Sequence, residues 1–136
     1  MEPIQISLTA SHLSQLETIA RLALPNESCA FLLGRSVAGN SSVTEIMPLA
    51  NAKLSPFSFS IEPAELLKAY EEAESKKLQV IGIFHSHPAR PSPSATDTKY
   101  MELNPVAWLI YSTTEMKFGA YISDGGTRRL EIVVRD

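Results

Sequence analysis

Cysteine and histidine are scarce in this chain, which has one cysteine, Cys29, and three histidines among 136 residues. A single cysteine excludes an internal disulfide and fits a reducing compartment, so we expect a cytoplasmic protein. No run of 18 apolar residues is present, and the opening MEPIQISLTA lacks the features of a signal peptide, so we expect no membrane association. The net charge of −3, without a basic stripe, argues against nucleic acid as the main partner.

The residue pattern predicts one mixed α/β (α+β) domain over residues 1–136, with a largely antiparallel sheet and two or three helices. Apolar runs predict strands at 4–8, 28–34, 43–50, 57–61, 78–84, 106–112, 117–123 and 128–134. Capping residues predict helices that begin after Thr9 or Ser11, at Glu62-Pro63 and at Ser94. We expect the second helix to turn Leu66, Leu67 and Tyr70 toward the core.

The segment FHSHPARPSPSATD, residues 84–97, contains two of the three histidines and ends on an aspartate. His85 and His87 follow a predicted strand, so both rings face one side and Ser86 faces the other. Three prolines after His87 stiffen the loop that returns Asp97 to the histidine pair. Two imidazoles and one carboxylate leave a tetrahedral position open, which is typical of a catalytic rather than a structural zinc site.

Spacing alone leaves other interpretations of these residues open. An isolated His-x-His pair is often satisfied by hydrogen bonds, and the same ligand set serves non-haem Fe(II). Glu27, between a proline turn and an apolar run, is by itself most simply a solvated loop carboxylate. Ser94 is by itself a helix cap, a role worth about 1 kcal/mol. His12, in the first turn of a helix, is not expected to take part.

Together these segments resemble a known family. HSHP at 85–88, followed by PSATD at 93–97, resembles the JAMM (MPN+) metalloprotease motif, and the spacing between the second histidine and the aspartate agrees. PNESCAFLLG at 25–34 resembles the glutamate-bearing strand of its bacterial form, with Ala30 where glycine is usual. The order of elements is similar over nearly the whole chain, so the protein resembles the compact prokaryotic form.

The resemblance implies a cytidine-deaminase-like fold and zinc-dependent hydrolysis of peptide or isopeptide bonds. It makes His85, His87 and Asp97 the ligands of one Zn²⁺ per chain. It also implies that Glu27 holds the attacking water and moves its protons, while Ser94 helps to stabilise the oxyanion. The chemistry agrees, because one carboxylate outside the metal shell can serve first as base and then as acid.

The resemblance further implies a substrate, namely a ubiquitin-like protein or sulfur carrier that is cut after its C-terminal Gly-Gly tail. We expect the segment 42–59 to form one wall of a narrow groove that holds this tail extended by backbone pairing. Arg35 and Arg90 flank the predicted site from two directions and are candidates to meet a substrate carboxylate, although a solvated surface arginine is the default interpretation of each. Cys29 and Trp108 are expected to pack in the core.

Two other functions would require different residues. A non-catalytic MPN-type scaffold domain should lack one or more of the ligands, and this chain lacks none. A zinc deaminase acting on a nucleobase would need a Cys-x-x-Cys pair, which a chain with one cysteine cannot supply.

Overall fold

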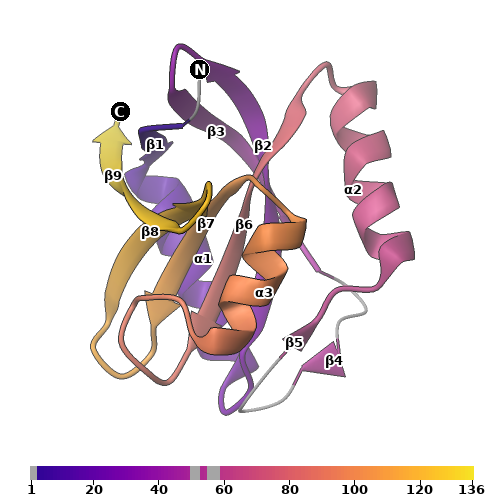
Figure 1. Cartoon of the computed structure of the whole chain (residues 1–136). Coiled ribbons are helices and arrows are strands. Elements are labelled where there is room, and N and C mark those ends of the chain that lie inside the picture. The colour runs from indigo at the N-terminus through magenta and orange to yellow at the C-terminus, as the bar shows by residue number, and fades with distance from the viewer. Residues whose placement is uncertain (1–2, 50–52, 55–58) are drawn as a thin grey trace.

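A computed structural model describes residues 3–49, 53–54 and 59–136 (Figure 1). The three helices of this part are α1 (Ala10–Ala23), α2 (Pro63–Ser75) and α3 (Ala95–Leu103). The long strands are β1 (Gln5–Thr9), β2 (Ser28–Val37), β3 (Asn40–Pro48), β6 (Gln79–His87), β7 (Ala107–Ser112), β8 (Lys117–Ser123) and β9 (Thr127–Arg135). Two short strands, β4 (Lys53–Leu54) and β5 (Phe59–Ser60), pair with each other.

The seven long strands close into a barrel in the order β1-β3-β2-β6-β7-β8-β9. The pairs β1–β3, β1–β9 and β6–β7 are parallel, and the other four adjacent pairs are antiparallel. The predicted mixed α+β fold with an antiparallel majority is therefore confirmed. Closure depends on β1, which pairs in parallel with β3 on one side and with the last strand, β9, on the other.

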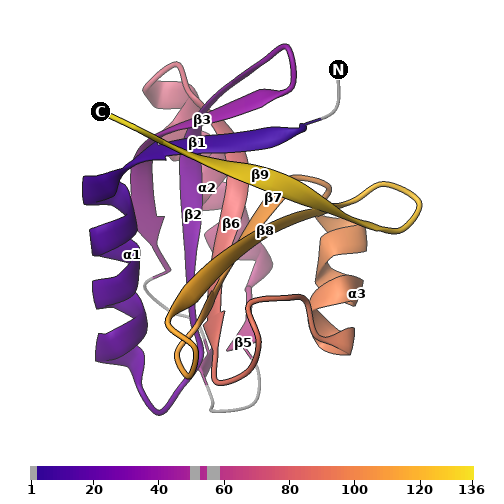
Figure 2. The ribbon, with the colours of Figure 1, turned by 90° about the vertical axis from the view of Figure 1, so that its left-hand side faces the viewer.

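The central strands separate two apolar cores, with α1 on one side and α3 on the other (Figure 2). Leu16 and Ala20 of α1 pack in the first core, while Ala69 of α2 and Met101 of α3 pack in the second. Strands buried on both faces read as continuous apolar runs. This explains why SCAFLLG, LQVIGIF and AWLIYS carry no polar alternation.

Helix α2 corrects one prediction about the core. Leu67 and Tyr70 are 59% and 49% exposed, and the fully covered positions of the helix are Ala69 and Ala73, one turn apart. Small residues allow the helix backbone to lie close to the sheet, so this stripe faces inward in place of Leu67 and Tyr70. Leu66 packs against the second core as predicted.

His12 belongs to the start of α1. The Thr9 hydroxyl accepts from the His12 amide at 3.0 Å, and His12 Nδ1 accepts from the Thr9 amide at 3.1 Å. This is a capping box in which a histidine takes the place usual for glutamate. Partial burial lowers the pKa of His12, which keeps Nδ1 available as an acceptor. None of the described helices is long and apolar enough to cross a membrane.

Candidate metal and catalytic site

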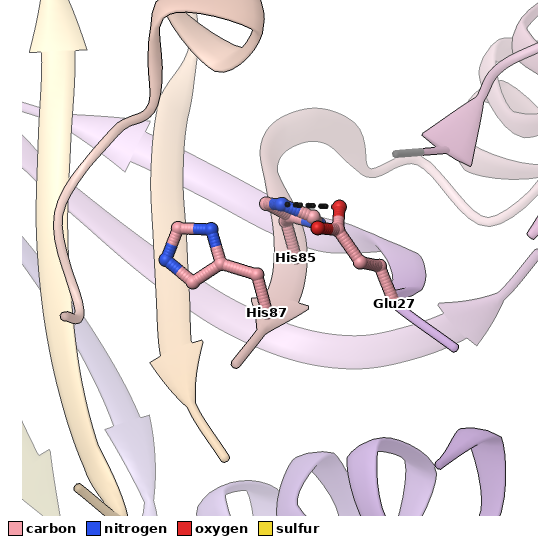
Figure 3. Close-up of side chains that lie close together, drawn as sticks. All are labelled: Glu27, His85 and His87. Atoms are coloured by element: carbon pink, nitrogen blue, oxygen red, sulfur yellow. Dashed lines mark ion pairs between the residues drawn. The ribbon is translucent and has the colours of Figure 1, made fainter. Parts of the chain in front are cut away.

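Strand β6 carries both predicted histidine ligands to the centre of the sheet, between β2 and β7. His85 and His87 are 0% and 5% exposed. His85 is paired with Cys29, whose side chain packs in the core beneath α2 and α3, so both rings point to that side. Glu27 directly precedes β2 and reaches toward His85 (Figure 3).

Two carboxylates converge on this histidine pair. His85 Nε2 lies 3.2 Å from Glu27 Oε1 and 3.2 Å from Asp97 Oδ1, and His87 Nδ1 lies 3.7 Å from Asp97 Oδ2. Ligand atoms of Glu27, His85 and His87 all lie within 4.8 Å of one another. Atoms that bind one tetrahedral zinc at about 2.0–2.1 Å lie roughly 3.4 Å apart. The spacing of these nitrogen and oxygen atoms therefore fits a metal ion. A site with three protein ligands needs only one of the two carboxylates, so the other is free for a different role.

Backbone carbonyls orient the two rings. His85 Nδ1 lies 3.2 Å from the Ser28 oxygen, and His87 Nε2 lies 2.7 Å from the Arg90 oxygen. A carbonyl can only accept, so the ring hydrogens belong on these two nitrogens. Nε2 of His85 and Nδ1 of His87 are then left to bind a metal. The two carbonyls correspond to the outer partners that usually orient histidine ligands in a metal site. Burial lowers the pKa of His87, which favours the neutral ring that a ligand must have.

Asp97 is fixed by the start of α3. The Ser94 amide donates to Asp97 Oδ2 at 3.0 Å, and the Asp97 amide donates to Ser94 Oγ at 3.0 Å. Burial alone would raise the pKa of Asp97, but its contact with His85, aided by the Ser94 amide and by His87, holds it below its usual value. The predicted cap is therefore confirmed, and the Ser94 hydroxyl keeps its hydrogen available for donation.

Glu27 lies in a different electrostatic setting. It is 7% exposed, and burial raises its pKa against the opposing effect of His85. A carboxyl group whose pKa moves toward neutrality is better matched to proton transfer than an ordinary surface glutamate. The two carboxylates at the histidine pair thus differ, since the pKa of Asp97 is lowered and the pKa of Glu27 is raised.

Comparison with known proteins identifies the family. Residues 9–121 match the family described as prokaryotic homologs of the JAB domain. The chain belongs to this family. This JAB-domain chain is 34% identical to a protein of Desulfitobacterium hafniense whose solution structure superposes with a TM-score of 0.86, covering 97% of this chain and 94% of that one. A Salinibacter ruber protein gives 26% identity and a TM-score of 0.72, over 97% and 92% of the two chains.

Two of the three curated relatives compared with the JAB-domain chain are named as a protease or a peptidase. It is 45% identical over 85 residues to the desampylase of Pyrococcus furiosus, covering 62% of this chain and 58% of that protein. It is 36% identical over 78 residues to a probable TtuB-protein conjugate cleaving protease of Thermus thermophilus, with coverages of 56% and 52%. It is 30% identical over 97 residues to a CysO-cysteine peptidase of Mycobacterium tuberculosis, with coverages of 71% and 65%. The match spans less than two thirds of each relative's length.

The predictions for the residues around the site, namely a cysteine, a tryptophan, two arginines and the groove wall, have different outcomes. Cys29 is 4% exposed and Trp108 is fully buried, so both pack in the core as predicted. Arg35 does not flank the site, because it lies toward the far end of β2 from Glu27 and its guanidinium donates to the Lys77 carbonyl. It is exposed, which agrees with its default interpretation as a surface arginine. Arg90 does lie beside the site, where its backbone oxygen holds His87. The predicted wall at 42–59 includes residues 50–52 and 55–58, which lie outside the described residues.

Gly119 of β8 supports the histidine loop. A Cβ at this position would lie 2.2 Å from the Pro91 carbonyl oxygen, so only glycine lets the loop lie this close to the strand. We expect Gly119→Ala to push away the loop that carries the Arg90 oxygen, and so to weaken zinc affinity about 10–100-fold. Competition with a chelator measures this change.

Gly34→Ala is the matched control for Gly119→Ala. Its Cβ would lie 1.9 Å from the Ser42 carbonyl oxygen, an equally severe collision toward the other end of β2 from Glu27. We expect it to lower the melting temperature without a specific loss of zinc affinity. A folded Gly119→Ala variant with wild-type zinc affinity would show that the loop does not depend on this contact.

Proposed function

We propose that this chain is a zinc metallopeptidase that hydrolyses the peptide or isopeptide bond after the Gly-Gly tail of a ubiquitin-like protein, and that residues 1–136 form one such domain. The observation that carries the proposal is the convergence of His85, His87, Asp97 and Glu27, with both ring hydrogens directed away from the site. A scaffold domain has no need of four buried side chains whose possible metal-binding atoms are turned toward one another. The names of the relatives, which refer to conjugate cleavage and peptidase activity, support the same substrate class.

In this proposal the metal is held by Nε2 of His85, Nδ1 of His87 and the Asp97 carboxylate. Zinc, when bound, lowers the pKa of a coordinated water and polarises the carbonyl to be cut. Glu27 accepts a proton from the attacking water as the new carbon–oxygen bond forms. It then delivers that proton to the leaving nitrogen as the carbon–nitrogen bond breaks, which completes hydrolysis with one carboxylate. The Ser94 hydroxyl, held by the Asp97 amide, donates to the oxyanion.

A substrate series tests the proposed specificity. A ubiquitin-like protein with a short extension after Gly-Gly should be cut, and replacing the glycine just before the scissile bond by valine should abolish cleavage. The reason is that a tail of two glycines has no side chains, so a groove narrow enough to select it excludes a β-branched residue. Mass spectrometry of the products measures the outcome.

The residue just after the scissile bond provides the control substitution, and changing it should matter less. If the valine substrate is cut at a comparable rate, the chain is a more general peptidase. The same conclusion follows if a short unstructured peptide is cut as well as the intact ubiquitin-like protein.

A further inference from the structure

A buried pair of serine hydroxyls lies directly behind the site. Ser28 and Ser86 are 2% and 0% exposed and face each other across β2 and β6. The Ser28 amide donates to Ser86 Oγ at 3.1 Å, and the two hydroxyls share a short hydrogen bond. Ser86 alternates with His85 and His87, so its side chain lies on the opposite face of β6 from the rings.

Every polar group of Ser28 is used in this arrangement. Its amide and hydroxyl bond to Ser86, while its carbonyl oxygen lies 3.2 Å from His85 Nδ1. Ser28 also directly follows Glu27, whose Oε1 lies 3.2 Å from His85 Nε2. Ser28 therefore contacts His85 at Nδ1 and is joined by a peptide bond to Glu27, whose side-chain carboxylate lies at Nε2 of the same ring.

The Ser28 amide has a side-chain oxygen as a hydrogen-bond acceptor. It donates to the Ser86 hydroxyl, which belongs to the residue paired with Ser28 across the two strands. A serine hydroxyl has one hydrogen and two lone pairs, so Ser86 Oγ can accept from the amide and still bond to the Ser28 hydroxyl. Without the Ser86 oxygen, a buried amide next to Glu27 and the Ser28 hydroxyl would both lose this acceptor, and the start of β2 would shift to compensate.

We propose that Ser86 and Ser28 are positioning residues that set the distance between the Glu27 carboxylate and the ring of His85. This inference rests on the proposed function, in which Glu27 transfers protons and His85 is a ligand. The hydroxyl pair ties the start of β2 to β6, and the Ser28 carbonyl fixes both the tautomer and the tilt of His85. Substrate does not touch this pair, so it acts through the two residues that it holds.

Ser86→Ala is the direct test. We expect kcat to fall about 10–100-fold with KM nearly unchanged, because partners in this second layer support geometry and not substrate binding. Zinc affinity should weaken by a similar factor, and the Ser28 amide should exchange with solvent at least about tenfold faster. Ser86→Thr, which keeps the hydroxyl, should restore these properties toward wild type.

Ser41→Ala is the matched control. Ser41 is 1% exposed, and its hydroxyl has no hydrogen-bond partner among the described residues. This variant removes an equally buried hydroxyl elsewhere, and we expect its kcat and zinc affinity to match wild type. If Ser86→Ala does not fold, Ser86→Cys repeats the test with less change in volume, because sulfur is a weak acceptor and the losses should run in the same direction.

The experiment separates this inference from the proposed function. If wild-type protein cleaves no ubiquitin-like substrate, the proposed function fails, while zinc affinity and Ser28 amide exchange still decide the positioning role. A folded Ser86→Ala variant with wild-type zinc affinity and wild-type amide exchange would overturn the inference. An equal loss of zinc affinity in Ser41→Ala would also overturn it.

Discussion

Glu27→Gln is expected to lower turnover by about 10²–10⁴-fold while the fold and the bound zinc are retained. The amide of glutamine can still hydrogen-bond a water, but it cannot accept the proton of that water or return one to the leaving nitrogen. The change preserves shape and removes only proton transfer. Single-turnover kinetics on a zinc-loaded variant measure the loss of turnover, and elemental analysis of the same sample measures the retained zinc.

The zinc content of Glu27→Gln also decides which carboxylate is the ligand. His85 Nε2 is equally far, at 3.2 Å, from Glu27 and from Asp97. Asp97 in addition contacts His87, and its pKa is lowered, whereas the pKa of Glu27 is raised. An anionic oxygen that contacts both histidines is the better third ligand. We therefore expect Asp97→Asn, and not Glu27→Gln, to release the metal.

Glu102→Gln is the control for Glu27→Gln, because it makes the same chemical change at an exposed position of α3. It should leave turnover at the wild-type level. Near-normal kcat in zinc-loaded Glu27→Gln would place the base elsewhere. Loss of zinc from Glu27→Gln would instead make Glu27 a ligand, and the assignment of the two carboxylates would have to be exchanged.

The site could be predicted from sequence where local geometry determines it. The His-x-His pair needs only an extended strand to place both rings on one side, and the cap of α3 needs only Ser94 and Asp97 three residues apart. Glu27 was different. Its segment suggested a loop carboxylate, and only the pairing of β2 with β6 brings it to His85. That pairing joins residues far apart in the chain, and no local pattern encodes its register.

Other features had no signal in the sequence. The Ser28 and Arg90 groups that orient the histidines are backbone oxygens, which every residue possesses, so residue type does not reveal them. The inward face of α2 was misjudged because hydrophobicity favours Leu67 and Tyr70 over alanine, while close packing favours alanine. Strand length alone separates Arg35 from the site, since eight residues of strand place it roughly 26 Å from Glu27.

His87→Ala is expected to lose most of the bound zinc. The substitution removes Nδ1, which lies 3.7 Å from Asp97 Oδ2, and also the ring nitrogen that holds the loop through the Arg90 oxygen at 2.7 Å. A ligand present at 100 times its dissociation constant stabilises the folded state by about 2.7 kcal/mol. Added zinc should therefore raise the melting temperature of the wild type and not that of His87→Ala.

His12→Ala provides the control for the loss of an imidazole, because His12 belongs to the cap of α1 and to no part of the site. It should lower stability but keep full zinc content and a normal response of the melting temperature to zinc. His87→Ala should instead melt like chelator-treated wild type, with or without added zinc. Full zinc occupancy in folded His87→Ala, or no zinc in reconstituted wild type, would show that the four buried donors are a hydrogen-bonded core cluster and not a metal centre.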